Sequence, residues 1–348
     1  MFFAEVSGTP YEMGYQFGRA TRLAVASTID FLTKSFRGWD DARLARERER
    51  YLKYTEKRLP ELIEEIQGIA DGSGFSFRLI YLANCYASLR AAAQGCTNII
   101  FTRTPEGPLL AKTNDLPVSE GKHSGVCLRR PQVGLQTLSL TFPGTAWRGA
   151  GLNEAGLAIG GSSCSAQVPL PTEFLNPHMV GAYVLANCAT VKEAIALLRE
   201  VTCSNWGANL TLLDKSGAAA IVEKAGTLTG VRLPDGERLW CANHALTPEL
   251  AGHSAGSPEA MRESRERFET IDRLTRDRPL SLALMRAVLA YSGRPGALSR
   301  YGDDDPVHYE TELASIMRPA ECRMDVCFSH PDRDPWRHFS LARGWEED

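Results

Sequence analysis

The stretch Gln94-Gly95-Cys96-Thr97-Asn98-Ile99-Ile100 marks the point where the pattern of this chain changes. The residues before Cys96 have helical periodicity, whereas those after it alternate as in short strands. Cys96 is therefore expected to open the first strand of a sheet, directly after a residue without a side chain. A cut between Gly95 and Cys96 would leave a residue that carries both a thiol and an α-amine, a nucleophile and a base. A lone cysteine is more often a small buried hydrophobe, so this interpretation needs further support.

The composition describes an ordinary globular protein. Its 348 residues are 43% hydrophobic and 23% charged, which is enough for a sizeable core. A formal net charge of -3 gives no reason to expect nucleic acid or an anionic membrane as a partner. Basic residues cluster in 43–58 and 262–278, where acidic residues are interleaved with them. Both clusters predict solvated helix faces.

The chain has nine cysteines, and their spacing does not form a paired metal-ligand pattern. The first residues lack the basic region and the long apolar core of a secretion signal. No uninterrupted apolar run approaches the roughly 20 residues of a membrane helix. We therefore expect a cytoplasmic protein with reduced thiols, without a metal, a cofactor or a membrane partner.

The order of elements predicts an α+β fold. Helical patterns occupy residues 11–31, 41–69 and 77–92, and strand patterns follow at 98–103 and 108–113, joined by the hairpin signal Thr104-Pro105-Glu106-Gly107. Further strands, two helices, a second set of strands, a charged helix at 258–275, a helix at 281–291 and two closing strands complete the chain. This order predicts two sheets stacked face to face with helices outside, in one domain. Residues 1–95 are expected to wrap onto the body formed by residues 96–348.

The segment Lys112-Thr113-Asn114-Asp115 ends the second predicted strand. In a hairpin, the end of the second strand returns to the start of the first, so Asp115 is expected close to Cys96. A carboxylate there could orient an α-amine or a thiol, as the third member of a catalytic triad orients its base. The alternative is that Asn-Asp-Leu-Pro is ordinary turn chemistry.

Two further segments are candidates for stabilising an oxyanion. In Cys241-Ala242-Asn243-His244, the Asn243 amide could point into a cleft as a hydrogen-bond donor, or it could simply end a strand. His244 permits a Cys–His dyad, although a histidine beside a turn is more often structural. Gly160-Gly161-Ser162-Ser163 follows a buried strand and could offer a backbone N–H to a carbonyl oxygen, or could be a bulge.

Taken together, four motifs resemble the isopenicillin-N acyltransferase family, the C45 peptidases of the N-terminal-nucleophile (Ntn) hydrolase superfamily. In chain order they are Gly95-Cys96-Thr97, Asn114-Asp115, Gly151-Leu152-Asn153-Glu154-Ala155-Gly156-Leu157 and Asn243-His244. The resemblance implies a four-layer αββα sandwich and a precursor that cuts itself between Gly95 and Cys96. The resulting chains, 1–95 and 96–348, would stay associated.

The resemblance also implies roles for single residues. Cys96 would be the nucleophile, Asp115 would position it, and the Asn243 side chain would help to form the oxyanion hole. Lys112 stands where related bile-salt and penicillin V hydrolases usually have arginine, and it lacks arginine's bidentate fork. Those relatives also have an asparagine near the position of Ser162-Ser163.

The function expected from these residues is hydrolysis of a small N-acyl amide through an acyl-thioester. An acyltransferase that passes the acyl group to an amine would use the same acyl-enzyme. A silent αββα protein that binds a ligand without turnover is a further alternative. A papain-like hydrolase using His244 or His308 is a third, but a papain-type cysteine opens a helix and Cys96 is expected to open a strand.

Overall fold

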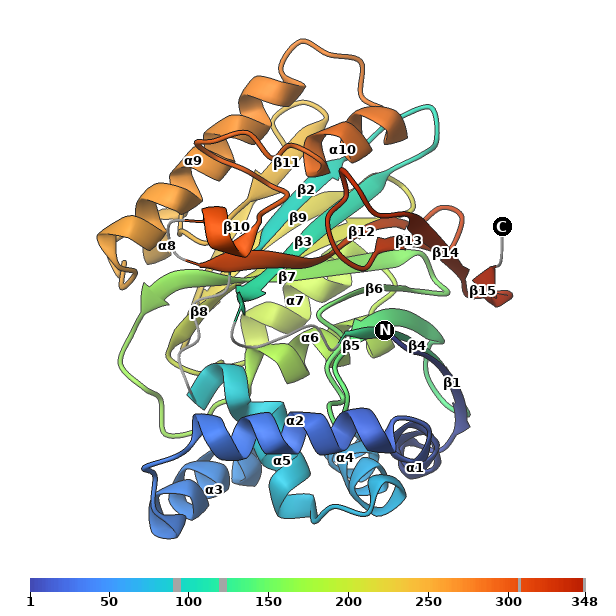
Figure 1. Ribbon diagram of the computed structural model, residues 1–348, viewed down its shortest axis with the longest axis vertical. Coiled ribbons are helices and arrows are strands. Elements are labelled where there is room, and N and C mark those ends of the chain that lie inside the picture. Colours follow the sequence, from blue (N-terminus) through green and yellow to red (C-terminus); the bar gives the residue numbers. More distant parts are fainter. Residues whose placement is uncertain (90–94, 119–123, 306–307, 347–348) are drawn as a thin grey trace.

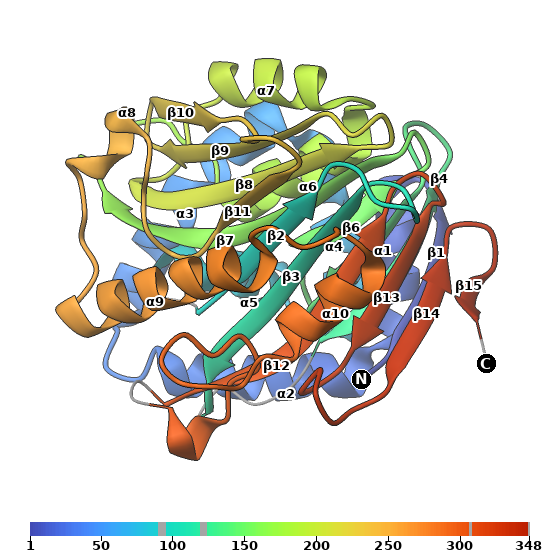
Figure 2. The same cartoon turned by 90° about the horizontal axis from the view of Figure 1, so that it is seen from above.

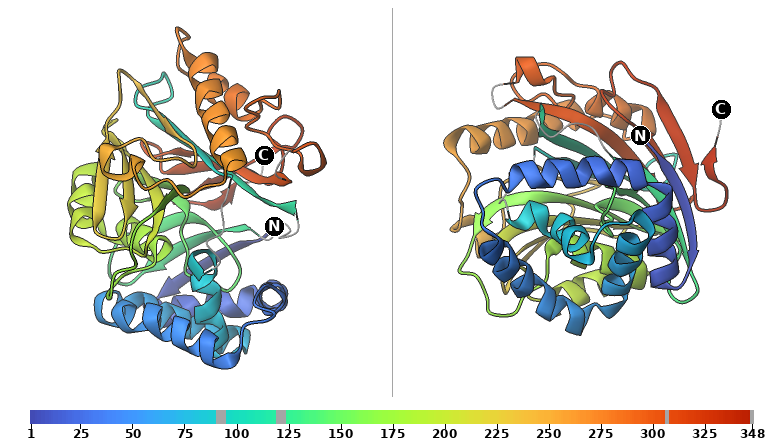
Figure 3. Two further views of the ribbon diagram at one scale, coloured as in Figure 1. Left: turned by 90° about the vertical axis from the view of Figure 1, so that its left-hand side faces the viewer. Right: turned by 60° about the horizontal axis from the view of Figure 1, so that its bottom comes forward.

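The computed structural model describes residues 1–89, 95–118, 124–305 and 308–346, with side chains omitted for 86–89. Two β-sheets lie face to face between layers of helices (Figure 1). The helices at the start of the chain and those near its end lie on opposite sides of the sheets (Figure 3). The predicted four-layer αββα sandwich is therefore confirmed.

The first sheet has eight strands and is antiparallel except for its edge pair, β1 and β4, which run parallel. Its strands, in spatial order, are β1 (Phe3–Gly8), β4 (Gly125–Pro131), β5 (Thr137–Thr141), β6 (Ala150–Asn153), β7 (Leu157–Gln167), β8 (Trp206–Asp214), β9 (Ala219–Ala225) and β10 (Leu228–Arg232).

The second sheet has seven antiparallel strands. In spatial order they are β11 (Arg238–Cys241), β2 (Thr97–Phe101), β3 (Leu109–Pro117), β12 (Tyr309–Arg318), β13 (Arg323–Cys327), β14 (Trp336–Ser340) and β15 (Gly344–Glu346). The predicted hairpin after Cys96 is present as β2 and β3.

The helices divide between the two outer layers. One layer contains α1 (Pro10–Ala20), α2 (Arg22–Ser35), α3 (Asp41–Arg58), α4 (Pro60–Ser73), α5 (Phe77–Leu89), α6 (Pro177–Asn187) and α7 (Val191–Glu200), which share a core with the eight-stranded sheet. The other contains α9 (Pro258–Thr275) and α10 (Leu282–Leu289), which lie over β2, β3 and β12 in Figure 2. A single-turn helix, α8 (Pro248–Ala251), and a 3₁₀ turn, η2 (Gly302–Asp304), lie in connections.

Alternation along β2 fixes which residues reach which layer. Ile99 and Phe101 pack against α9 and α10, whereas Ile100 packs between the two sheets. Successive strand residues point to opposite faces, so Cys96 is expected on the same face as Ile100. This face looks into the space between the sheets.

The expectation that only helices precede Cys96 is wrong, because β1 is a strand. Its partner β4 lies more than a hundred residues along the chain, so no local pattern could reveal the pairing. The predicted helix 41–69 is also two helices, since Pro60 removes an N–H donor and restricts Leu59 to a non-helical conformation. The predicted helix 11–31 is likewise divided at Thr21.

The helix expected at 77–92 is α5, whose last residues fall outside the described part of the chain. None of the helices in the described ranges combines the length and the apolar character needed to cross a membrane.

Candidate functional site

Cys96 lies at the start of the strand that is flanked by β3 on one side and by β11 on the other. Continuing the two strand registers beyond their last pairs places Asn114 and Asn243 directly beside Cys96. Three segments that are far apart in the sequence therefore meet at one end of the seven-stranded sheet. The strand pairing alone creates this arrangement.

Asn114 contacts the thiol. Cys96 Sγ lies 3.5 Å from Asn114 Oδ1, which also accepts a hydrogen bond of 3.1 Å from Lys112 Nζ. Asn114 Nδ2 donates to Glu312 Oε2 at 2.8 Å. Lys112 is 1% exposed, so a buried cation is linked to the thiol through a shared amide oxygen. Glu312 could not be recognised from the sequence, because it enters the site at an irregularity in the β12–β3 pairing.

Asp115 lies on the opposite face of β3 from Asn114. Its Oδ1 accepts a 2.8 Å hydrogen bond from Thr311, and its Oδ2 is 3.9 Å from Arg300 Nη1. Its main-chain oxygen accepts from the N–H of Gly95 at 3.2 Å. Asp115 is therefore placed beside the backbone that leads into Cys96 rather than beside the thiol. Burial raises the pKa of Asp115 above its ordinary value, against the opposing effect of the Arg300 guanidinium.

Gly95 occupies a position without room for a side chain. A Cβ there would collide with Arg300 Nη1 and would lie 3.3 Å from both Asp115 Cβ and the Tyr309 ring. Arg300 cannot move aside freely, because its Nε and Nη2 donate to the Asp305 carboxylate at 2.7 and 2.8 Å. The Arg300–Asp305 ion pair therefore leaves no room for a side chain at Gly95.

The Asn243 side chain lies between Ser163, which accepts hydrogen bonds from it, and Arg267, which donates one to it. Its Nδ2 donates to the main-chain oxygen and to Oγ of Ser163, at 3.1 and 2.9 Å. Its Oδ1 accepts a 2.8 Å hydrogen bond from Arg267, which also donates to the main-chain oxygen of Cys96 at 2.8 Å. Arg267 is 2% exposed, so the expectation that residues 262–278 form only a solvated face is wrong at this position.

His244 belongs to the packing between β11 and α9. Its Nδ1 lies 2.7 Å from Ser264 Oγ, and its ring meets Phe268 edge to face at 5.4 Å. Burial lowers the pKa of His244 to about 4, so the ring is neutral at physiological pH. His308 is exposed, just before β12. Because Cys96 leads directly into β2, the arrangement also lacks the cysteine-bearing helix of a papain-like hydrolase.

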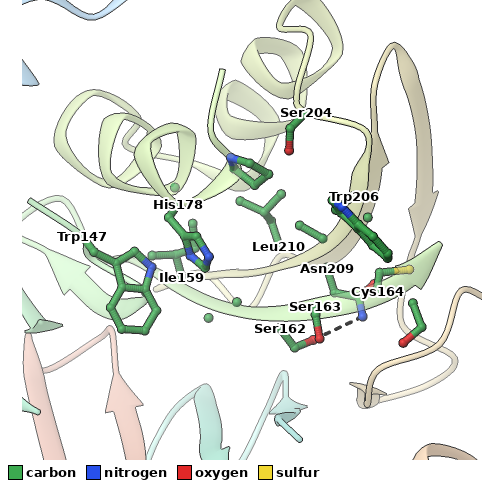
Figure 4. A pocket seen from close by; sticks show the side chains of 18 of the residues that line it. Trp147, Ile159, Ser162, Ser163, Cys164, His178, Ser204, Trp206, Asn209 and Leu210 are labelled. Atoms are coloured by element: carbon green, nitrogen blue, oxygen red, sulfur yellow. Dashed lines mark hydrogen bonds between the residues drawn. The ribbon is translucent and has the colours of Figure 1, made fainter. Parts of the chain in front are cut away.

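Gly161 and Ser162 lie on β7, in the facing sheet. Ser162 Oγ donates to the main-chain oxygen of Ala242 at 3.0 Å. It also accepts from Asn209 Nδ2 at 3.2 Å, the hydrogen bond drawn in Figure 4. The close approach that the glycines were expected to permit occurs at Gly160, where a Cβ would collide with a side chain of β2. Gly161 has ordinary contacts, and the neighbour of Asn243 is Ser163 rather than Ser162.

A cavity of about 250 Å³ opens beside this site, between β7, β8 and the start of α6. Ser163, the partner of Asn243, is part of its wall. Figure 4 shows the larger side chains around it, which are Trp147, Ile159, His178, Trp206 and Leu210. Burial lowers the pKa of His178 to about 4, and the charge of Lys112 adds to this effect. The cavity therefore presents two indoles, a neutral imidazole and aliphatic groups, together with serine hydroxyls, Asn209 and Arg148, whose guanidinium is paired with Glu65.

The described part of the chain contains no group of three or more His, Cys, Asp or Glu side chains placed to hold a metal ion. The buried arginines Arg267 and Arg300 were not predicted as site residues. Their only sequence signal was their position in or near charged segments, and such residues usually face solvent.

Residues 102–333 match the model of a family described as acyl-coenzyme A:6-aminopenicillanic acid acyl-transferase. Among curated proteins, the chain is similar to the 40 kDa form of acyl-coenzyme A:6-aminopenicillanic-acid-acyltransferase from Emericella nidulans. The two are 31% identical over 169 residues. This match spans 46% of the present chain and 46% of that relative, so it covers just under half of each.

Solved structures with a similar course of the chain include penicillin V acylase from Agrobacterium tumefaciens, with a TM-score of 0.49 and 17% identity over 71% of this chain and 87% of that one. A Caenorhabditis elegans orthologue of N-acylethanolamine-hydrolyzing acid amidase has a TM-score of 0.45 and 14% identity, over 65% of this chain and 93% of its own. A variant of conjugated bile acid hydrolase from Clostridium perfringens has a TM-score of 0.48 and 13% identity, over 73% and 99%.

Proposed function

This chain belongs to the acyl-coenzyme A:6-aminopenicillanic acid acyl-transferase family, and on that premise we propose that it is a self-processing amidohydrolase with an N-terminal cysteine. The observation that carries the proposal is the position of Cys96. It follows a glycine that cannot be replaced without a collision, and it lies between Asn114 and Asn243 at the end of a sheet. A cysteine that served only for packing would not need these polar neighbours.

The first reaction is the cut itself. The Cys96 thiolate attacks the carbonyl carbon of Gly95, a C–S bond forms, and the C–N bond to Cys96 breaks as its nitrogen takes a proton. Water then hydrolyses the thioester, which releases the Gly95 carboxylate and regenerates the thiol. We assign to Asp115 the role of holding the α-ammonium that this step creates, since its side chain lies beside the backbone that leads into Cys96.

Gly95→Ala is expected to slow self-cleavage by about tenfold or more, because the added methyl group collides with Arg300 and moves the scissile carbonyl. Overpacking of this kind also costs about 1–3 kcal/mol in the free energy of unfolding. Intact-mass analysis over time measures the cleaved fraction. Gly252→Ala is the matched control, since a Cβ at Gly252 meets no atom within 4 Å. Equal cleavage rates in the two variants would contradict the role given to Gly95.

In the cleaved protein, the α-amine of Cys96 takes the thiol proton, since the ordinary pKa of an α-amine is about 7.7–8.0. The thiolate attacks the carbonyl carbon of an amide substrate, and the tetrahedral oxyanion replaces Ser163 Oγ as an acceptor of one of the two N–H groups of Asn243 Nδ2. The α-ammonium then protonates the departing amine. Water hydrolyses the acyl-thioester and completes the cycle.

We assign the cavity beside Ser163 to the acyl group of the substrate. Its two indoles, Ile159 and Leu210 favour an uncharged acyl group of modest size, aliphatic or aromatic. Its position next to Asn243 supports this assignment, because the acyl carbonyl must reach the oxyanion donor and the thiol together.

The two chains produced by the cut are proposed to stay associated. Strand β1 of the first chain is hydrogen-bonded to β4 of the second. Glu65 of α4 accepts hydrogen bonds from Arg129 and Arg148 at 2.8 and 2.7 Å, and all three side chains are buried. Both contacts cross from residues 1–95 to residues 96–348.

The proposal is tested by intact-mass analysis and size exclusion of the purified protein, followed by a panel of amides. We expect two masses, for 1–95 and 96–348, that elute together. The panel holds N-acyl amino acids, N-acyl amines and penicillins, each with short and long acyl groups. A full-length mass that persists under folding conditions, or a cleaved protein inactive on the whole panel, would count against the function.

Transfer of the acyl group to an amine is the second candidate, and the description of the matching family favours it. Adding amine acceptors to the same panel distinguishes the two reactions. An N-acylated product in excess of the free acid would identify a transferase.

A further inference from the structure

Arg267 joins the nucleophile to the proposed oxyanion donor. Its Nη1 donates to the main-chain oxygen of Cys96 and to Thr97 Oγ1, both at 2.8 Å, and its Nη2 donates to Asn243 Oδ1 at 2.8 Å. A guanidinium has only donors, held in a rigid plane. One buried side chain on α9 therefore fixes the distance and orientation between two groups on separate strands.

The hydrogen bonds of Asn243 determine which way its amide faces. On one side Arg267 can only donate, and on the other the main-chain oxygen of Ser163 can only accept. Turning the amide over would set Nδ2 against the guanidinium and Oδ1 against a carbonyl oxygen. Both contacts would then be repulsive and buried, and two polar groups would be left without a suitable partner.

The backbone of Asn243 is anchored to the same helix. Its N–H donates to Ser264 Oγ at 2.7 Å, three residues before Arg267 on α9. Helix α9 thus sets both the backbone position and the side-chain orientation of Asn243. The Nδ2 donor is directed toward Ser163, which lines the cavity assigned to the acyl group.

Arg267 remains charged where it is buried. Burial and the neighbouring Arg300 lower its pKa to about 10, and Asp115 opposes this effect. A group with this pKa is a cation at neutral pH, so its hydrogen bond to Asn243 is charge-assisted and stronger than a neutral one. Polarisation of the amide through Oδ1 also strengthens Nδ2 as a donor.

We propose that Arg267 is a positioning residue that directs Asn243 Nδ2 at the oxyanion and ties this donor to Cys96. This inference rests on the proposed function, because it assigns a part of the same site. It goes beyond that function because it gives the contact of Arg267 with Cys96 and Asn243 a role in turnover rather than in folding alone.

The test is steady-state kinetics of Arg267→Met on the best amide of the panel. We expect kcat to fall by about 100-fold and KM to change by less than about threefold, as when one oxyanion donor is lost. Arg265→Met is the matched control, since Arg265 is exposed on the same helix. Arg267→Lys keeps the charge but loses the fork, and is expected to recover less than a tenth of kcat. It also serves as the test if the Met variant does not fold.

A double-mutant cycle separates positioning from a general structural effect. In an Asn243→Ala background, Arg267→Met is expected to reduce kcat by less than about threefold further, because the group it directs is already absent. A full additional 100-fold loss there, or unchanged kcat in the single variant, would overturn the inference. Failure of the proposed function is distinct, because wild-type protein would then cleave no amide.

Discussion

Replacing Cys96 by alanine is expected to leave a folded, full-length chain that neither cuts itself nor turns over any amide. The thiol sulfur is the atom that attacks in both reactions, so the substitution removes the nucleophile from both. The loss of turnover should be on the order of 10⁴-fold or more, as when the nucleophile of an acyl-transfer enzyme is removed. Intact-mass analysis and amide hydrolysis measure the two effects.

Two controls support this experiment. Cys322→Ala removes a half-buried thiol on the turn between β12 and β13, and is expected to cut itself and turn over like the wild type. Far-ultraviolet circular dichroism and the thermal midpoint show whether Cys96→Ala has kept the fold. A Cys96→Ala protein that still separated into 1–95 and 96–348 would remove Cys96 from the role of nucleophile.

Replacing Glu65 by alanine is expected to have the largest effect on stability. Arg129 and Arg148 would remain buried with no counter-charge, and breaking such a pair costs about 3–5 kcal/mol. Burial alone would raise the pKa of Glu65, but the two guanidiniums hold this pKa below its ordinary value. The contribution of Glu65 to stability is therefore complete when the pH lies above the ordinary pKa of a glutamate. It is lost as the pH falls through the lowered pKa of the folded protein.

Urea unfolding in the uncut Cys96→Ala chain measures the free energy of unfolding without the complication of two chains. In the cleaved protein, size exclusion is expected to show release of residues 1–95 from the Glu65→Ala variant. Glu64→Ala is the matched control, because Glu64 is exposed on the same helix. If the two variants unfolded at the same urea concentration, the buried charge cluster would not hold the chains together.

Local patterns predicted much of the fold. Alternation and turn residues located the β2–β3 hairpin, and the charged helical pattern at residues 258–275 located α9. They did not reveal β1, whose partner is distant in the sequence, or β14 and β15 near the end of the chain. A short strand has too few residues for a periodic signal, and only its pairing identifies it.

The residues of the candidate site also fall into two groups, those that local sequence patterns identified and those that they did not. The Gly95-Cys96 junction, Asp115 and Asn243 could be chosen from the sequence, because each lies at the end of a predicted strand. Arg267 could not, because a basic residue in a charged helix gives the same pattern whether it faces solvent or the core. Its burial depends on how α9 is set against β2 and β11.

The sequence by itself determined most of the elements, the stacking of two sheets between helices and the choice of the Gly95-Cys96 junction, since these depend on periodicity and on residue type. Only the tertiary structure decided on which face each side chain acts. It set Cys96 with Asn114 between the sheets, and Asp115 on the other face beside Arg300. It also supplied the reason for Gly95, which is the position of Arg300. Contacts across strands and layers join residues that are distant in the chain, and a local pattern carries no information about them.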